Sequence, residues 1–155
     1  MAGDAIAQAT PEDDEILCAH YLRLWEGYGV PPEHLLPAAR QEVLAFLAQG
    51  RAEFQLAAFA CRRGEAVIGS ACCQVRRSPY PEVIAPEHRK VGYIWSLYVD
   101  PAHRRQGLAR RMTDACIGHL RDIGCHTVLL HSSQAGLPLY RSMRFEPTSE
   151  LRLTL

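Results

Sequence analysis

One segment, from Tyr93 to Leu130, constrains the fold more than any other part of the chain. It begins with an aromatic and β-branched run, Tyr93 to Val99 (YIWSLYV), which is typical of a strand and stops at Asp100-Pro101. A helix is predicted from about Gly107 to Asp122, because its apolar residues recur on one face, and a short apolar strand is predicted over residues 127–130. Two strands joined through a helix make a βαβ unit, so these strands should be parallel.

Two helices and a hairpin are predicted before this unit. The first helix starts at Thr10-Pro11-Glu12-Asp13, where Thr10 can cap, and its pattern stops at Gly27 and Gly29. The second starts near Pro37 and ends at Gly50. Its inward-facing residues are predicted to be Val43, Phe46 and Leu47. From Phe54 the spacing of apolar residues changes from a helical to a strand pattern. Strands are predicted over Phe54 to Arg62 and Ala66 to Arg76.

The remaining segments complete the expected fold class. Ser78 to Lys90 is rich in proline and polar residues, which is typical of a surface loop, and Gly136 to Met143 is a predicted short helix. Phe145 to Pro147 and Leu151 to Leu155 are predicted to close the sheet as a strand pair, because the leucines of the second segment alternate with polar residues. The order indicates an α+β or α/β fold with a mixed sheet.

Length and charge narrow the function classes. The chain has 155 residues, which favours a single domain over 1–155, and its 17 basic residues balance 17 acidic ones. A neutral chain is a poor candidate for broad binding to nucleic acid or to an anionic membrane. No apolar run reaches the roughly 18 residues of a membrane span. The six cysteines form no metal-ligand spacing, so we expect no metal site and interpret them as free thiols in a reducing cytoplasm.

The turn from Val99 to Ala109 (VDPAHRRQGLA) joins the predicted strand to the predicted helix. A helix start leaves N–H groups unpaired and carries partial positive charge, so residues 105–109 can aim several N–H groups at one anion. Gly107 allows close approach of the backbone. The pattern favours a phosphate or pyrophosphate site, although the motifs of nucleoside triphosphate and dinucleotide sites are absent. The alternative is an ordinary turn with solvated arginines.

Two motifs carry a resemblance to a known family. Arg104-x-x-Gly107-x-Ala109, after Leu97-Tyr98-Val99-Asp100-Pro101, resembles the acyl-CoA-binding signature (R/Q)-x-x-G-x-(G/A) of the GNAT superfamily of N-acetyltransferases. The segment Leu139 to Phe145 (LYRSMRF) resembles the LY-x-x-x-GF element of the same family. The resemblance runs from about Pro11 to the C-terminus. It implies a GNAT-like mixed central sheet with helices on both faces and two parallel strands that splay apart in the middle.

The resemblance also implies an activity and residue roles. Acetyl-CoA would be the co-substrate, and its acetyl group would pass directly to an amine through a tetrahedral intermediate. Tyr140 would protonate the departing thiolate, and the alternative for Tyr140 is a place in the core. The backbone that would pair with the pantetheine arm belongs to Leu97, Tyr98 and Val99. The turn that would hold the pyrophosphate comprises Arg104, Arg105, Gln106, Gly107, Leu108 and Ala109, with Arg110 beside it.

The chain departs from the family pattern at two positions. Arg144 stands where the family usually has a glycine at a left-handed helix end, a conformation that costs another residue about 1–2 kcal/mol. Either the helix ends differently here, or Arg144 adopts the left-handed conformation at that cost. The choice affects where the Tyr140 side chain points. Ser133 stands near the place where many members have an Asn that contacts the cofactor.

The acceptor is expected to be a small-molecule amine, because no acidic run suggests a groove for polyamines or histone-like tails. Its predicted pocket residues are Trp25, Tyr28 and Trp95, for which the alternative is a place in the core. No acid occurs between Tyr93 and Leu97, where some family members place one. The base therefore stays unassigned, and its weaker candidates are His131, His103 and Glu26.

Two other functions stay open. The first is a non-catalytic acyl-CoA sensor or partner module of the same fold. This alternative stays open because the predicted strand lacks the acid that some family members have there. The second is nucleic-acid binding through the arginines at positions 104, 105, 110 and 111, which the neutral charge disfavours. The resemblance further implies a homodimer, because members of the family commonly form dimers.

Overall fold

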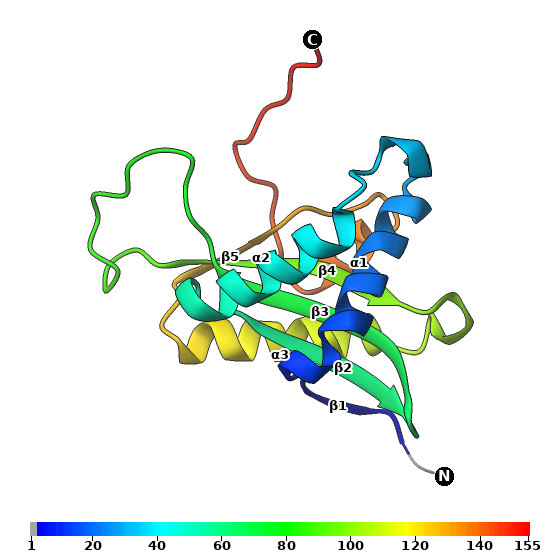
Figure 1. Cartoon of the computed structure of the whole chain (residues 1–155). Helices are drawn as coiled ribbons and strands as arrows, with labels where there is room; N and C mark the ends of the chain where they lie inside the picture. The colour runs from blue at the N-terminus through cyan, green and yellow to red at the C-terminus, as the bar shows by residue number, and fades with distance from the viewer. Residues whose placement is uncertain (1–2) are drawn as a thin grey trace.

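The computed structural model describes residues 3–155, so residues 1 and 2 of the predicted 1–155 domain lie outside it. A five-stranded sheet with the order β1-β2-β3-β4-β5 forms its centre (Figure 1). Pairing is antiparallel from β1 through β4 and parallel between β4 and β5, so the sheet is mixed, as predicted. The strands are β1 (Ala5–Gln8), β2 (Ala57–Arg63), β3 (Ala66–Val75), β4 (Val91–Val99) and β5 (Thr127–Leu130).

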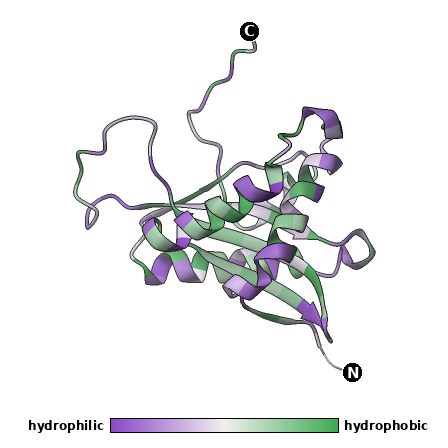
Figure 2. Ribbon diagram, viewed as in Figure 1, coloured by the Kyte–Doolittle hydropathy of each residue, from purple (hydrophilic) through white to green (hydrophobic). Residues whose placement is uncertain are grey.

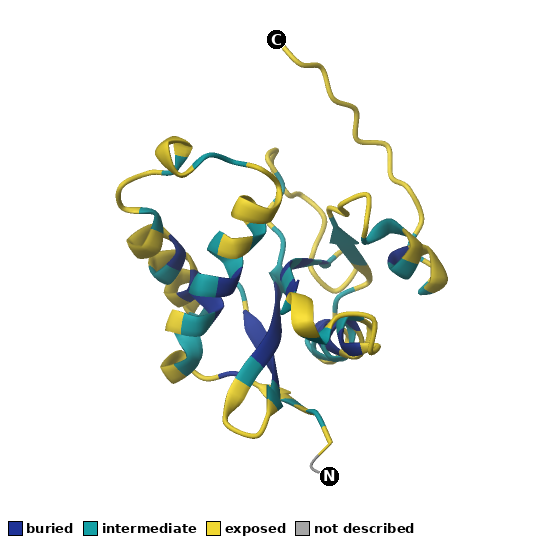
Figure 3. Cartoon of the chain, turned by 90° about the vertical axis from the view of Figure 1, so that its right-hand side faces the viewer, coloured by how far each residue is buried: buried dark blue, intermediate teal, exposed yellow. Residues whose placement is uncertain are grey.

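Helices cover both faces of the sheet. α1 (Asp14–Gly27) and α2 (Ala39–Glu53) pack on one face, and α3 (Leu108–Asp122) packs on the other (Figure 3). The short helix α4 (Leu137–Ser142) follows β5. This arrangement confirms the predicted βαβ unit β4–α3–β5 and the predicted helices on both faces. Among residues 3–155, no helix has both the length and the apolar content to cross a bilayer.

The sheet separates two apolar cores, because successive strand residues face opposite sides. The core under α3 contains buried residues such as Cys73, Met112 and Leu120, whereas the core under α1 and α2 contains Leu47 and Cys72. The adjacent cysteines 72 and 73 therefore serve different cores. Figure 2 shows the apolar colour concentrated on the strands and on the helix sides that face them. All six cysteines are free, and five are buried, as expected of small core residues.

A β-bulge in β4 changes which residues face which core. Between Cys72↔Trp95 and Ser70↔Tyr98 the register shifts, so β4 has one more residue than β3 over this stretch. The extra residue adopts a left-handed conformation at Ser96, with a φ of 55°. Before the bulge Ile94 packs toward α3, and after it Leu97 and Val99 do so, although the spacing of an unbroken strand would have placed them on the opposite face.

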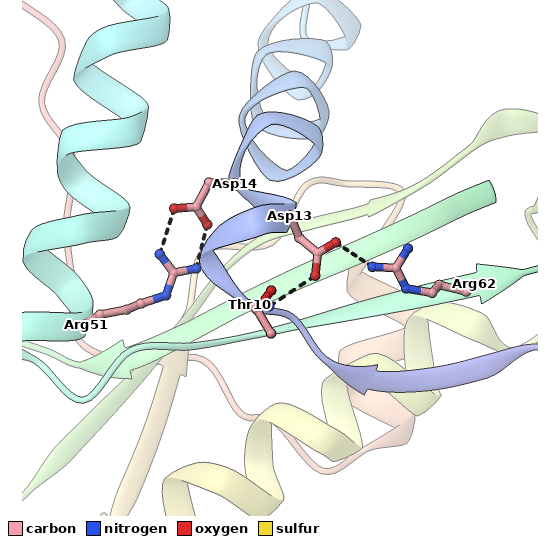
Figure 4. Close-up of polar contacts among 5 residues, drawn as sticks. All are labelled: Thr10, Asp13, Asp14, Arg51 and Arg62. Atoms are coloured by element: carbon pink, nitrogen blue, oxygen red, sulfur yellow. Dashed lines mark hydrogen bonds and ion pairs between the residues drawn. The ribbon is translucent and has the colours of Figure 1, made fainter. Parts of the chain in front are cut away.

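The start of α1 is fixed by ion pairs to neighbouring elements (Figure 4). Asp13 accepts the N–H of Thr10 at 3.0 Å and pairs with Arg62 of β2, and Asp14 forms a two-pronged pair with Arg51 of α2 at 2.5 and 2.7 Å. A 3-10 turn over Pro11–Asp13 occupies the predicted helix start, and α1 itself begins at Asp14. The Thr10 side chain makes no cap hydrogen bond, and the contact at this start is the one from the Thr10 N–H to the Asp13 carboxylate. These carboxylates also suit the positive end of the helix.

A polar cluster is buried beside the bulge. The Nδ1 atom of His20 lies 2.8 Å from the hydroxyl oxygen of Ser70, and the His20 ring stacks on Tyr98 at 4.4 Å between ring centroids. Burial lowers the pKa of His20 from 6.5 to about 4, and the positive charge of Arg23 adds to the effect. His20 is therefore neutral at pH 7, and it ties α1 to β3 and β4 at one point.

The structure corrects the predicted ends of the chain. It adds β1, which the sequence did not signal because a four-residue strand is defined by its long-range pairing, such as Ile6↔Cys61. It shows no strand at Phe145 to Pro147 or Leu151 to Leu155, where residues 151–155 are exposed. Leucine alternation made that segment compatible with a strand, but a strand also needs an edge to pair with.

Two details of α2 also differ from the prediction. The helix continues past Gly50 to Glu53, and Gly50 is buried against Leu56. Phe46 does not face the core, since it is 47% exposed. Glycine at position 50 serves close packing here, because an added Cβ would lie 2.6 Å from the Leu56 side chain.

The buried His20 predicts acid sensitivity. Between its folded pKa of about 4 and its ordinary value of 6.5, the unfolded chain binds more protons, so stability is lost as pH falls through that window. The loss amounts to about 3 kcal/mol when the window has been crossed. Urea denaturation from about pH 7 to about pH 4.5 should show a shallower decline for His20→Gln than for the wild type. The matched control is His34→Gln at an exposed position, and parallel curves for wild type and His20→Gln would contradict the assignment.

Candidate active site

The parallel strands β4 and β5 lie at one edge of the sheet, and they pair along only part of β4. Their pairing runs from Val91↔Thr127 to Ile94↔Leu130 and then stops, while β4 continues to Val99. Within residues 3–155, no strand pairs with β4 after Ile94 on the β5 side. The pairing thus ends where the predicted splay would begin, although β5 is the edge strand of the described sheet and not a central one, and the backbone of residues 97–99 runs along an open edge. The side chains of this stretch are packed away, with Tyr98 buried on His20.

The turn after β4 presents a run of free backbone donors. Within the described chain, the N–H groups of residues 105–110 have no hydrogen-bond partner, and the first bonded N–H is that of Arg111, to the Gly107 carbonyl at 3.2 Å. Arg105 and Gly107 both adopt left-handed φ values, 63° and 77°, which alternate with Gln106. Such an alternation curves the chain so that successive N–H groups converge, a geometry that binds anions. An added Cβ at Gly107 would meet nothing within 4 Å, so the approach is open.

Arginine side chains surround this turn, and most are held in place. Arg104 donates from Nε to the Val99 carbonyl at 3.1 Å, Arg111 donates to the Asp4 carbonyl at 2.9 Å, and Arg110 donates to the Ser142 hydroxyl of α4. Arg105 makes no hydrogen bond or ion pair to residues 3–155. The turn therefore combines free amides with fixed positive charge, which suits a diphosphate.

Gln106 is also held from outside the turn. Its side-chain oxygen accepts from Arg63 at 2.8 Å, and Arg63 also pairs with Asp4 and lies 3.1 Å from His103. The paired Arg63 guanidinium lowers the pKa of Asp4. These contacts tie the N-terminal strand and the end of β2 to the turn, so its shape depends on segments far apart in the sequence.

Tyr140 lies in α4 and is 8% exposed. Burial raises its pKa to about 12, and the neighbouring Tyr28 adds to this. The phenol is therefore protonated at neutral pH. Its ring meets Phe145 edge to face at 5.7 Å.

The end of α4 settles the question raised by Arg144. The Phe145 N–H donates to the Tyr140 carbonyl and the Arg144 N–H to the Arg141 carbonyl, both at 3.0 Å. This is the Schellman pattern, with Tyr140 and Phe145 as its apolar pair. Arg144 has a φ of 67°, so the helix ends as it would with glycine and Arg144 bears the conformational cost.

Ser133 lies in the turn before α4. Its hydroxyl oxygen accepts the Gly136 N–H at 3.1 Å, and its carbonyl accepts from Gly136 and Leu137. The hydroxyl proton stays free to donate. The predicted contact of Ser133 with a cofactor stays a prediction.

An aromatic cleft of about 610 Å³ opens between α1, α2 and β4. The three predicted acceptor residues, Trp25, Tyr28 and Trp95, all line it. Neighbouring rings meet edge to face, with centroid distances of 5.9 Å for Trp25–Tyr28 and 5.2 Å for Phe46–Trp95. The residues that line the cleft are Tyr21, Leu24, Trp25, Tyr28, Glu42, Val43, Phe46, Gln74, Tyr93, Ile94, Trp95, Ser96 and His131. Two buried polar atoms in this set, Gln74 Oε1 and Trp95 Nε1, have no hydrogen-bond partner in the described chain.

The structure places only one of the three candidate bases in the cleft. His131 lines the cleft, where its ring contacts the Tyr93 hydroxyl, whereas His103 lies beside Arg63 and Glu26 does not line the cleft. The predicted acceptor residues do not include Glu42, the carboxylate in the lining. Its position four residues before Phe46 places both on one side of α2, a signal that the sequence carries.

Residues 17–145 match the model of the Acetyltransferase (GNAT) family. The chain belongs to this family. The match covers both motifs, so the resemblance predicted from the sequence is confirmed.

Curated and solved relatives agree with the family assignment. Glucosamine 6-phosphate N-acetyltransferase of Trypanosoma brucei brucei is 35% identical over 68 residues, which cover 43% of this chain and 46% of that protein. The chain thus matches less than half the length of that relative. A GCN5-related N-acetyltransferase from Ralstonia eutropha has a TM-score of 0.82 at 26% identity, over 99% of both chains. A predicted acetyltransferase from Clostridium acetobutylicum, solved with acetyl-CoA, has a TM-score of 0.84 at 22% identity, over 98% of this chain and 96% of its own.

The strained Arg144 gives a stability prediction for this GNAT family member. Arg144→Gly removes a left-handed non-glycine residue, so it should raise the free energy of unfolding by about 1 kcal/mol and Tm by about 2–4 °C. The matched control is Arg141→Gly, which places the same substitution inside α4 and should lower stability by about 1 kcal/mol. Thermal unfolding followed by circular dichroism measures both. Destabilisation by both substitutions would contradict the strain at position 144.

Proposed function

We propose that this GNAT family member is an acetyl-CoA-dependent N-acetyltransferase that acts on the amine of a small molecule. The observation that carries the proposal is the run of six unpaired N–H groups at residues 105–110, at the end of the open edge of β4. Hydrogen bonds to a charged group contribute about 1.5–3 kcal/mol each, so a few of them anchor a diphosphate.

The residues fit coenzyme A in two places. The turn from Arg104 to Ala109, with Arg110 beside it, would hold the pyrophosphate through its amides and positive charge. The backbone of Leu97, Tyr98 and Val99 would hold the pantetheine arm as an added strand, because no strand of residues 3–155 pairs with that edge of β4. Bound acetyl-CoA supplies an activated acetyl group as a thioester.

Backbone and side-chain groups of the protein would assist the transfer of the acetyl group. The bulge at Ser96 leaves backbone groups out of the β3–β4 ladder, and we assign an N–H near Leu97 to the developing negative charge on the acetyl oxygen. The amine must lose its proton before it attacks. For an amine with a pKa near 10.4, this costs about 4.6 kcal/mol at pH 7. The neutral amine nitrogen attacks the thioester carbon, the carbon–nitrogen bond forms and the carbon–sulfur bond breaks. The attacking nitrogen loses one proton and the departing sulfur gains one, so the products are a neutral amide and a free thiol.

Tyr140 is the residue that we assign to the leaving sulfur. Its raised pKa of about 12 keeps the phenol protonated, so it is available as a hydrogen-bond donor. Full transfer of its proton to a thiolate with a pKa near 8.5 would be uphill by about 4.8 kcal/mol. Donation of a hydrogen bond to the departing thiolate is therefore the role that best fits this side chain.

The relatives support the substrate class in general terms. The trypanosome relative is named as an N-acetyltransferase of an amino sugar phosphate, and the Clostridium structure is described with acetyl-CoA. The first fits a small-molecule amine acceptor, and the second fits acetyl-CoA as the co-substrate. The second candidate function is an acyl-CoA-binding module without turnover, which the absence of a carboxylate in the strand Val91–Val99 favours.

Acetyl-CoA should stabilise the protein through the α3 turn. At about 100-fold above Kd, bound ligand contributes about 2.7 kcal/mol, which raises Tm by about 5–10 °C. Gly107→Glu should abolish this shift, because it places a carboxylate against the diphosphate. The matched control is Gly124→Glu at the other end of α3, which has a φ of 84° and nothing within 4 Å of its Cβ. Equal ligand shifts in both variants would contradict binding at the α3 turn.

Tyr140→Phe should separate catalysis from binding. It removes the hydroxyl but keeps the ring, so kcat for acetyl transfer should fall by about 100-fold while Kd for acetyl-CoA stays within about twofold. Thiol release measures the first and calorimetry the second. Tyr80→Phe, at an exposed position in the Ser78–Lys90 loop, is the control. No amine-dependent thiol release from the wild type over a broad amine panel would favour the binding module.

A further inference from the structure

The aromatic cleft leaves large apolar side chains outside both cores. Trp25 is 39% exposed, Phe46 is 47% exposed and Tyr28 is 59% exposed, and all three line the same hollow. Single exposed apolar residues are ordinary on a protein surface, but a continuous set that lines a concave site marks a binding surface. The rings form an edge-to-face series from Tyr28 through Trp25, Tyr21 and Trp95 to Phe46.

The charged side chains that line the cleft restrict which ligands can bind there. Among the described residues that line it, Glu42 is the one carboxylate, and none is an arginine or a lysine. A phosphate in this cleft would lose water without gaining a fixed cation, which is costly for a charged group. A polycation would find one carboxylate for several ammonium groups. One ammonium group near Glu42 is the charge that the lining matches.

The volume fits a small molecule. About 610 Å³ lies within the range of about 300–1,000 Å³ that is usual for small-molecule sites. Aromatic walls favour an aromatic or other apolar body through edge-to-face packing and attract an ammonium group through their ring faces.

We propose that the acceptor is a primary amine carried on an aromatic or other apolar body, with a single positive charge and no phosphate. This inference rests on the proposed acetyl transfer and names the substrate class of that site. It separates this chain from its trypanosome relative, which is named for a phosphorylated amino sugar. The acetylated product is a neutral amide, so it no longer pairs with Glu42.

The chain contains a reporter for this cleft. Its two tryptophans, Trp25 and Trp95, both line the hollow, so intrinsic fluorescence reports occupancy without turnover. The probes are phenylethylamine, the neutral phenylethanol, glucosamine 6-phosphate and spermidine. Phenylethylamine should change the emission at concentrations at least about tenfold below those needed for glucosamine 6-phosphate or spermidine.

Substitutions then test the charge and the walls separately. Glu42→Gln should weaken phenylethylamine binding about threefold and leave phenylethanol binding unchanged, because the carboxylate is exposed and acts only on the cation. Phe46→Ala should weaken both probes about tenfold, since it removes a wall. Glu33→Gln removes an exposed carboxylate outside the cleft and should leave both unchanged. In the transfer assay, Glu42→Gln should raise KM for phenylethylamine with kcat unchanged.

Failure of this inference can be told apart from failure of the proposed function. Tighter binding or faster acetylation of glucosamine 6-phosphate than of phenylethylamine, or an equal effect of Glu42→Gln on the amine and the alcohol, overturns the substrate class. So does acetylation of other amines in the panel with no acetylation of the aromatic amine. Absence of any acetyl-CoA-induced thermal shift in the wild type overturns the proposed function, whereas the fluorescence titration still reports what the cleft binds.

Discussion

Ser96 is an extra residue in the ladder between β3 and β4, and the architecture of the site follows from it. The bulge lies two residues after the last pairing of β4 with β5 at Ile94. Before it, Trp95 faces α1 and α2. After it, Leu97 and Val99 turn toward α3 and anchor the open end of β4 to that helix. A strand without this insertion would present the opposite side chains to each core. The buried His20–Ser70–Tyr98 contact holds the bulged end from the other face.

This arrangement separates two kinds of charge. The free amides and the arginines gather at the start of α3, where a strand end and a helix start meet. The aromatic cleft lies between the two helices of the opposite face and β4, and its described lining contains no arginine or lysine. A phosphate-bearing group and an ammonium-bearing group would therefore be attracted to different regions. The parting strands lie between these regions, where the two substrates would meet.

The middle of the fold could be predicted from the sequence, and its margins could not. The βαβ unit from β4 to β5 has strong local signals, namely a β-branched run, an Asp-Pro stop and one apolar helix face. The free amides of the turn also follow from local rules, because every helix start leaves donors unpaired. β1 and the C-terminal segment depend instead on whether a distant edge accepts them, which four or five residues do not encode. Trp25, Tyr28 and Trp95 could be assigned to one pocket by residue type. The sequence places Glu42 on the same side of α2 as Phe46, but the packing of α2 on α1 decides that this side faces the cleft.

The cysteines described in the cores have a practical consequence for measurement. Burial raises the pKa of Cys18, Cys61 and Cys125, so these thiols are less nucleophilic at neutral pH than a free thiol. Cys72, Cys73 and Cys116 are sealed inside the sheet and under α3, where a bulky disulfide reagent has no access. A chromogenic disulfide added to the folded protein should therefore give a low background. If the proposed acetyl transfer takes place, colour that develops during the reaction counts molecules of released coenzyme, whereas a burst of colour from the protein itself reports unfolding.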